Sequence, residues 1–239
     1  MDDSLYYLSL NRQRGLKAEM SAIANNIANI DTPGFRREGM VFSEFVVSSP
    51  EGESLSMADM NTRFISPDPA SMRMTAAPLD LAIEGEGYFA IEDEQGFLLT
   101  RAGAFQRSEE GLLVTSRGES VLDSGQAPIF LPVEAGPIQI SRDGTVSAGG
   151  VEQAQIGVFN APPETMTRFA NTGFRANDGI DPVANPRVLQ GALEGSNVDA
   201  VLEIARMIEV SRAYERVQGL IQDEDDRIQN VIQTLGQPV

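Results

Sequence analysis

The chain has 239 residues, a length that suits one or two domains. It has 18 Lys and Arg against 35 Asp and Glu, and the resulting net charge of −17 disfavours binding to nucleic acid or to an anionic membrane surface. The absence of Cys, His and Trp excludes thiolate nucleophiles, Ser-His-Asp triads and zinc sites built from Cys and His. No apolar run is long enough to span a bilayer, so we do not expect the protein to be membrane-embedded.

The first predicted element is an amphipathic helix from about Ser4 to Ile30, within an N-terminal domain of residues 1–34. Pro33 and Gly34 end it, because proline disfavours helix at the preceding residue and glycine adopts turn geometry. Three asparagines near its end cost helix propensity; they either line a fraying end or hydrogen-bond to a neighbouring chain. The apolar stripe follows a 4-3-4-3 spacing: Leu16, Met20, Ile23, Ile27 and Ile30. The asparagines are Asn25, Asn26 and Asn29.

Residues 35–77 change character, from short apolar pieces to a mixture rich in Met, Ser, Asp and Pro. We expect an extended linker or hairpin here.

Residues 78–192 are predicted to form an antiparallel β-domain, a sandwich or an irregular barrel, because apolar residues alternate and turn signals recur at short intervals. From Ala161 onward Pro, Asn and Gly dominate, so we expect irregular structure anchored by Phe169 and Phe174. The predicted strands are Leu79–Ile83, Tyr88–Ile91, Phe97–Arg101, Leu112–Thr115, Ile129–Leu131, Ile138–Ile140, Thr145–Ser147 and Gln155–Phe159.

The last element, in a domain of residues 193–239, is a helix from about Val198 to Leu235, roughly 55 Å long at 1.5 Å per residue. Every seventh residue from Met207 is apolar, and a mixed column accompanies it, a pattern typical of a helix that packs along its length against another helix. The apolar column is Met207, Tyr214, Ile221, Ile228 and Leu235. The mixed column is Ile204, Ser211, Gln218, Asp225 and Ile232.

The predicted fold class is therefore α+β, with terminal helices forming a coiled-coil-like bundle around a central antiparallel β-rich domain. Pattern alone leaves two interpretations open. The terminal helices either form an ordinary antiparallel pair that closes the domain, or belong to a polymer subunit that bundles with its neighbours.

Sequence gives no sign of catalysis. Carboxylates cluster at Glu84 and Glu86, at 92–94 and at 223–226, but hairpin turns and solvated helix faces explain all three groups. The run at 223–226 lacks the ligand spacing and glycine of a calcium loop. We therefore predict no enzyme activity, no cofactor, no metal and no small-molecule substrate.

Several stretches resemble one known family, the axial proteins of the bacterial flagellar rod and hook. The N-terminal stretch from Ala24 to Arg36, ANNIANIDTPGFR, is similar to the signature of basal-body rod proteins. The stretch LDLAIEGEGYF at 79–89 resembles the start of that family's β-domain, and TRAGAF at 100–105 and GLLVT at 111–115 follow in the expected order. GALEGSNV at 191–198 and RAYE at 212–215 resemble its C-terminal signature.

The resemblance implies a non-enzymatic subunit of the basal-body rod that crosses the periplasm. It implies export by the flagellar type III apparatus, which agrees with the acidic, uncleaved start Met1–Ser4. Copies of itself and other rod proteins would be its partners, with the two apolar stripes, the three asparagines and Ile204 as the assembly interface. Tyr6 and Leu10 would form an export element. The opening residues resemble proximal-rod members more than distal-rod ones.

Three alternatives stay open. The chain could be a distal-rod or short hook-type axial protein. It could be a glycan-binding or glycan-degrading β-domain with helical dimerisation arms. A third possibility is an interaction module on a cytoplasmic scaffold.

Overall fold

The computed structural model describes residues 2–48, 54–94, 96–132, 134, 136–170, 172–177 and 179–235. It divides into two compact units: a helical unit of Met1–Ala28, Glu38–Phe64 and Asp199–Val239, and a β unit of Asn29–Arg37 and Ile65–Val198. The first helix is α1 (Asp2–Ala28), and the last is α2 (Ala200–Leu235).

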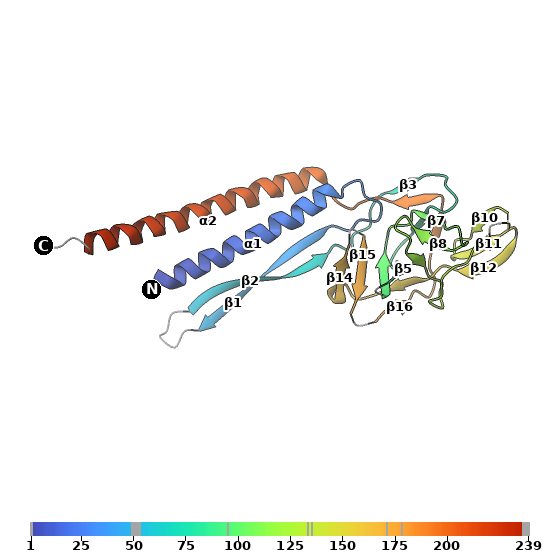
Figure 1. Cartoon of the computed structure of the whole chain (residues 1–239), viewed down its shortest axis with the longest axis horizontal. Coiled ribbons are helices and arrows are strands. Elements are labelled where there is room, and N and C mark those ends of the chain that lie inside the picture. The colour runs from blue at the N-terminus through green and yellow to red at the C-terminus, as the bar shows by residue number, and fades with distance from the viewer. Residues whose placement is uncertain are drawn as a thin grey trace. The chain divides into compact units, whose positions relative to one another are not determined.

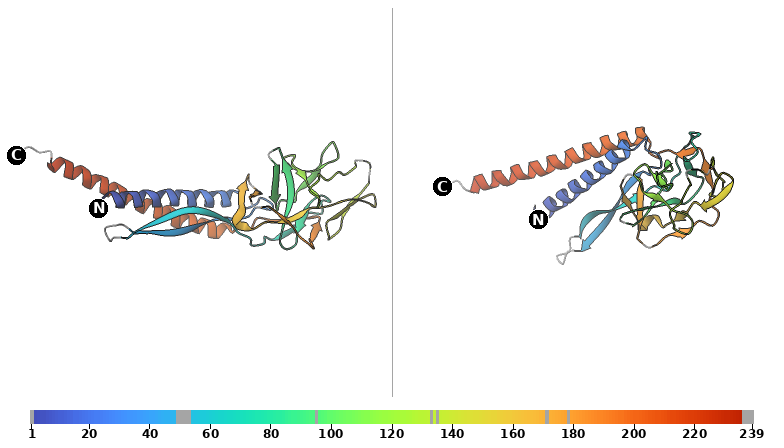
Figure 2. Two further views of the ribbon diagram at one scale, coloured as in Figure 1. Left: turned by 90° about the horizontal axis from the view of Figure 1, so that it is seen from below. Right: turned by 45° about the vertical axis from the view of Figure 1, so that its right-hand side comes forward.

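In the helical unit, α1 and α2 run antiparallel and side by side, and β1 (Glu38–Ser48) lies along α1 and pairs with β2 (Ser54–Ile65) (Figures 1 and 2). α2 begins at a side-chain cap, because Asp199 Oδ1 accepts hydrogen bonds from the backbone N–H groups of Val201 and Leu202 at 2.9 and 3.1 Å. Residues 35–77, expected as an extended linker, thus contribute a two-stranded sheet to this unit. Within the described residues, no helix is long and apolar enough to cross a membrane.

The β unit is built from short antiparallel strands. Its largest sheet runs in the order β14-β15-β6-β5-β9-β8-β7, and β13 joins it through β5 and carries β16. Three small sheets accompany it: β10-β11-β12, β17-β4 and β18-β3. The remaining strands are β3 (Met72–Met74), β4 (Leu81–Ile83), β5 (Tyr88–Asp93), β6 (Gly96–Thr100), β7 (Phe105–Arg107), β8 (Leu113–Thr115), β9 (Ser120–Val121), β10 (Ile138–Ile140), β11 (Thr145–Ala148), β12 (Val151–Gln155), β13 (Val158–Asn160), β14 (Met166–Phe169), β15 (Gly173–Ala176), β16 (Asp181–Pro182), β17 (Val188–Gln190) and β18 (Ala192–Glu194); a 3-10 turn, η1, spans Pro163–Thr165.

Two apolar clusters form the core of the β unit, one on each side of β5. Phe89 and Ile91 belong to the cluster that includes Leu98, Leu113 and Val146, while Tyr88 and Ala90 belong to the cluster around Phe159 and Phe174. Alternation along a strand produces this division, because successive side chains point to opposite faces.

The structure corrects the expected strands in three places. Residues 161–192, expected to be irregular, supply β14, β15 and β17, and Phe174 is fully buried while Phe169 is partly buried. The predicted strand Gln155–Phe159 is split, because Gly157 packs so closely on Asp123 that a Cβ would lie 2.4 Å from its carbonyl oxygen. The predicted strand Ile129–Leu131 holds only an isolated bridge, Leu112 with Phe130.

Candidate functional site: the helix seam and a buried junction

The helix pair packs along one apolar seam. Buried Leu16 and Ile23 of α1 meet buried Val210 and Val217 of α2. Partly buried side chains complete the seam: Met20, Ile27, Met207, Ala213, Tyr214 and Ile221. The structure thus brings together within one chain seven of the residues predicted for assembly, and their use between copies stays a prediction.

The companion column on α2 differs from the expected one. Ile204 is 50% exposed and lies outside the seam. The side chains that flank Met207 and Tyr214 in the seam are instead Val210 and Val217, three residues after each of them. Residues three before and three after Met207 both lie next to it on the helix surface. The seven-residue period alone therefore cannot show which of these two columns faces α1. Val210 and Val217, which are seven residues apart, were the signal that could have identified the correct column.

Asn26 is the polar centre of this unit. Its side chain is fully buried; Nδ2 donates to the backbone oxygen of Glu38 at 2.8 Å and to Glu203 Oε2 at 3.0 Å, and Oδ1 accepts from the backbone N–H of Glu38 at 2.9 Å. Its amide is thus hydrogen-bonded inside its own chain, and the predicted role of Asn26 toward a neighbouring chain stays a prediction. Asn26 links α1, β1 and α2.

The other predicted residues lie in varied surroundings. Asn25 is exposed, and Asn29 is buried in the β unit, where its Oδ1 accepts a hydrogen bond from Thr32 Oγ1 at 3.2 Å. Ile30 is partly buried in the same unit, and Leu10 is 37% exposed on α1. The side chains of Tyr6, Ile228 and Leu235 lie outside the described part of the structure.

The helices differ in length, and their register leaves part of α2 uncovered. Arg206 Nε lies 3.0 Å from Glu19 Oε1, which fixes residue 19 beside residue 206. Counting equal rises along both helices, the start of α1 reaches only to about residue 223 of α2. The C-terminal end of α2 extends past the start of α1 in every view (Figures 1 and 2). Among the described residues, these last turns have no α1 segment opposite them.

The β unit contains a buried junction of two arginines around one glutamate. Glu194 on β18 accepts ion pairs from Arg36 Nη2 at 2.7 Å and from Arg101 Nη1 at 3.2 Å, and the three residues are 2%, 2% and 5% exposed. Backbone carbonyls take up further guanidinium protons: Asp68 accepts from Arg36, and Ile83 and Gly85 accept from Arg101 at 3.2 and 2.6 Å. These bonds offset the cost of burying three charges.

The turn after α1 is fixed to the same junction. The backbone N–H of Gly34 donates to the carbonyl of Glu194 at 2.8 Å, and Phe35 is fully buried with the Arg168 guanidinium 4.5 Å from its ring centroid. Gly34 has φ +71°, and a Cβ there would lie 2.2 Å from the backbone N of Ala102. No side chain can take its place without moving that backbone.

Asn197 closes the junction just before α2. Its Oδ1 accepts from the backbone N–H of Arg37 at 2.6 Å, and its Nδ2 donates to the carbonyl of Asp68 at 2.9 Å. The chain that leaves α1 and the chain that enters α2 are therefore tied to one another inside the β unit. Sequence reasoning missed the roles of Arg36, Arg101 and Glu194. For Arg101 and Glu194 the signal was a single charge within a stretch of small and apolar residues, whereas Arg36 begins a run of three charged residues.

Burial governs the electrostatics of this region. Burial lowers the pKa of Arg101, with a smaller lowering from Arg36, while Glu194 opposes both. Burial also raises the pKa of Tyr88, whose ring centroid lies 5.2 Å from the Arg101 guanidinium, although Arg36 and Arg101 partly counter the effect. A cleft of about 600 Å³ borders both residues, with the exposed carboxylates of Glu86 and Asp181 on its wall.

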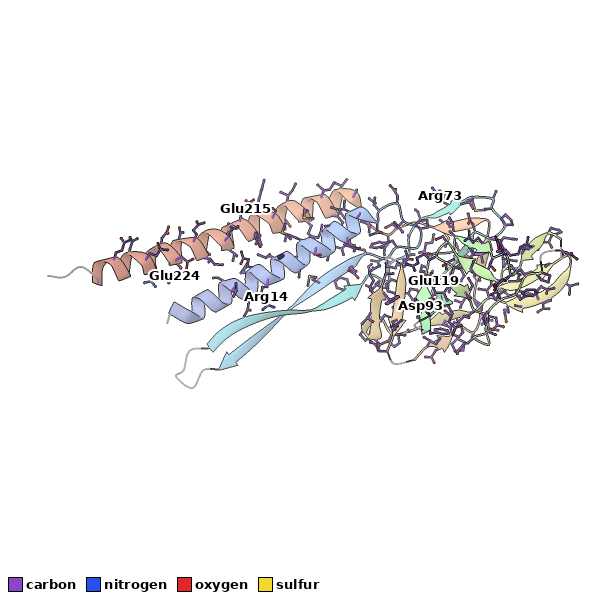
Figure 3. All side chains as sticks on the ribbon, viewed as in Figure 1. Arg14, Arg73, Asp93, Glu119, Glu215 and Glu224 are labelled. Atoms are coloured by element: carbon purple, nitrogen blue, oxygen red, sulfur yellow. The ribbon has the colours of Figure 1, made fainter. Side chains whose placement is uncertain are left out.

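The described residues offer no metal site, since no group of three or more acidic side chains is placed to hold an ion. The carboxylate clusters of the sequence lie at the surface, although Asp93 and Glu224 are partly buried. Glu84 pairs with exposed Arg187 at 3.9 Å, and Glu224 pairs with Arg227 one turn along α2 at 2.6 Å. The side chains labelled in Figure 3 include Glu224 and Asp93, which belong to two of these clusters.

Three family models match the chain in sequence order. Residues 9–36 match "Flagella basal body rod protein", residues 82–148 match "Flagellar hook protein FlgE/F/G D1 domain", and residues 189–234 match "Flagellar basal body rod FlgEFG protein C-terminal". Each matched segment supplies one residue of the buried junction: Arg36, Arg101 and Glu194 respectively.

Curated relatives match over nearly their whole length. The flagellar basal-body rod protein FlgF of Mesorhizobium japonicum is 35% identical over 99% of this chain and 99% of its own, and FlgF of Rhizobium meliloti is 34% identical over 96% and 97%. FlgG of Bacillus subtilis is 30% identical over 95% of this chain and 97% of its own. The chain belongs to the family of flagellar basal-body rod proteins and is similar to FlgF over nearly its whole length.

Proposed function

We propose that the chain is a structural, non-enzymatic subunit of the proximal part of the flagellar basal-body rod. One observation carries the proposal: the match to FlgF relatives runs from end to end, at 35% identity over 99% of both chains. FlgG of Bacillus subtilis matches at 30% identity, below the 35% and 34% of FlgF from Mesorhizobium japonicum and Rhizobium meliloti. We therefore favour the proximal rod over the distal rod and over a short hook-type protein.

In this role the terminal helices carry the assembly. The seam within one chain holds α1 against α2, while the last turns of α2 extend beyond α1 and can reach helices of adjacent subunits. Copies of the chain and other rod proteins are the partners. The β unit forms a separate body, and its buried junction fixes the two chain segments that lead to the helices.

Assembly and location are tested together. A strain without the gene should lose swimming motility, and a tagged full-length copy should restore it and be found in purified basal bodies. A copy with Leu131→Ala, changed in the core of the β unit, serves as a comparison for the effect of lowered stability alone. Full motility in the deletion strain, or absence of the tagged chain from purified basal bodies, contradicts the proposed function.

Export is tested separately. We propose that the chain leaves the cytoplasm through the flagellar type III apparatus without cleavage, and that Tyr6 and Leu10 belong to the export element. Removal of residues 2–10 should leave the chain in the cytoplasm of cells that still secrete other rod proteins. Secretion at the normal level would refute the assignment of Tyr6 and Leu10, and a shortened N-terminus on the secreted chain would refute uncleaved export.

A further inference from the structure

α2 carries a second apolar stripe on the side away from the seam. Val201, Ile204, Ala205 and Ile208 follow the i, i+3, i+4, i+7 spacing of a helix-packing face, yet Val201, Ile204 and Ile208 are 76%, 50% and 48% exposed and Ala205 is exposed as well. Glu203, Met207 and Val210, on the opposite side, face α1. A helix that is apolar on two sides packs against two partners, and the described part of this chain supplies one of them, α1.

α1 also carries a second, exposed stripe of residues at helical spacing. Six residues spaced 4-3-4-3-4 are all exposed, while Leu16 and Ile23 face the seam. The half of this stripe toward the end of α1 has small side chains, and the other half is basic with one leucine. The stripe consists of Leu10, Arg14, Lys17, Ser21, Ala24 and Ala28.

We propose that the outer stripe of α1 in one copy packs antiparallel against the outer stripe of α2 in a second copy. The two spacings coincide when Ala28 lies opposite Val201, Ala24 opposite Ala205 and Ser21 opposite Ile208. Small side chains on α1 then leave room for the bulky ones on α2, as ridges-into-grooves packing requires. The inference rests on the proposed function, because a rod places copies side by side.

Farther along the two helices, the same alignment places opposite charges together and a large side chain beside a glycine. Arg14 falls opposite Glu215, and Leu10 falls opposite Gly219, where open space surrounds the glycine. Lys17 falls opposite Arg212, with Glu209 and Glu215 within one turn of both. Glu215 projects from the side of α2 away from α1, and Arg14 from the side of α1 away from α2 (Figure 3). The two side chains of one copy thus point apart, and a pair between them has to join two copies.

An interface of this kind is heterologous, because each copy offers α1 to one neighbour and α2 to another. Heterologous contacts repeat into a ring or an open helical array and do not stop at a dimer. A symmetric dimer through the α1 stripe alone would bring Arg14 and Lys17 against the same pair in the partner. Charge therefore favours the mixed contact.

The absence of cysteine from the chain allows a direct test. Two separately tagged full-length variants, Ala24→Cys and Ala205→Cys, are expressed together in a strain that lacks the native gene, and cells are treated with a mild thiol oxidant. The expected result is a covalent dimer that carries both tags. Each variant expressed alone should give no dimer. A matched control pairs Ala24→Cys with Gln218→Cys, which is exposed on α2 but lies outside the stripe.

The outcomes separate this interface from the proposed function, which is read from the presence of the chain in purified basal bodies. If the chain is present there but the mixed dimer is missing, or the Gln218→Cys pair cross-links equally well, the interface is wrong and the rod function stands. If the mixed dimer forms while the chain is absent from basal bodies, the interface holds and the rod function fails. If the mixed dimer is missing and the chain is also absent from basal bodies, the interface and the rod function are both wrong. Cross-links to other rod proteins in place of the mixed dimer assign the stripe to a different partner and overturn the contact between copies.

Charge reversal supplies a second measurement, which is also read from the yield of the mixed dimer. Arg14→Glu and Glu215→Arg, each placed in both cross-linking variants, should reduce the yield of mixed dimer, and the two reversals combined should restore it. Both positions are exposed, so folding should be unaffected. A combined variant no better than the single ones contradicts the pairing.

Discussion

Asn26 on α1 and Glu203 on α2, 177 residues apart in the chain, are joined by a hydrogen bond of 3.0 Å from Nδ2 to Oε2 in a fully buried site. The bond crosses the helix pair beside apolar Ile23, and the same amide holds the backbone of Glu38 through two further bonds. A buried polar contact of this kind fixes register, because any shift along the seam leaves the groups unpaired.

Replacement of Asn26 by Ala should therefore destabilise the helical unit. The change leaves the buried carboxylate of Glu203 and the backbone groups of Glu38 with fewer partners, at a cost of about 1–3 kcal/mol. Chemical denaturation followed by circular dichroism measures the loss. Ser21→Ala, at an exposed position on the same helix, is the control and should stay within about 0.5 kcal/mol. Equal effects of the two changes would show that the buried contact does not matter.

Glu194→Ala should be among the most damaging single changes in the β unit. It leaves Arg36 and Arg101 buried without their carboxylate, and breaking a buried pair costs about 3–5 kcal/mol. The matched control is Glu84→Ala, whose partner Arg187 is 72% exposed, with an expected loss of about 0–1 kcal/mol. Unfolding monitored by tyrosine fluorescence compares them. A variant at Glu194 as stable as the control would mean that the junction contributes little.

Ile221→Asp should block incorporation into the rod while the β unit stays folded. Ile221 is partly buried in the helix seam, so a carboxylate there opposes packing of α1 against α2, but it lies outside both cores of the β unit. Amide hydrogen exchange on the purified variant should show fast exchange in α1 and α2 and unchanged protection in β5 and β6. Loss of protection in those strands, or normal incorporation in cells, would disprove this division of roles.

Stability of the β unit should fall in alkaline solution, with a contribution from Tyr88. Burial is the main cause that raises its folded-state pKa above the ordinary tyrosine value of 10.0. The stability that the protonated hydroxyl contributes is therefore fully present below pH 10 and is lost as pH rises through the folded pKa. Tyr88→Phe keeps the ring beside Arg101 and removes the titrating group. The free energy of unfolding, measured between pH 9 and pH 11, should decline less steeply in this variant than in the native chain. Parallel declines would assign the effect to other groups.

Local pattern was sufficient for the elements at both ends of the chain and for the class of the middle. Apolar residues at helical spacing predicted α1 and α2. The seam residues Leu16, Met20, Ile23 and Ile27 were predicted correctly because their spacing places all four on the same face of α1. The turn at Pro33 and Gly34 and the strand Ile138–Ile140 were also correct. Proline, glycine and alternation act over a few residues, and so they can be read without the rest of the chain.

Tertiary structure decided what depends on distant neighbours. Only the folded chain shows that Val210 and Val217, and not Ile204, face α1, because two columns of a helix satisfy the same period. Only the folded chain brings Arg36, Arg101 and Glu194 together in one buried site. The sequence around a charged residue does not show which distant residue will neutralise it in the interior. Asn26 is the clearest case: helix propensity counts it as a cost, and the structure makes it the bond that joins three elements.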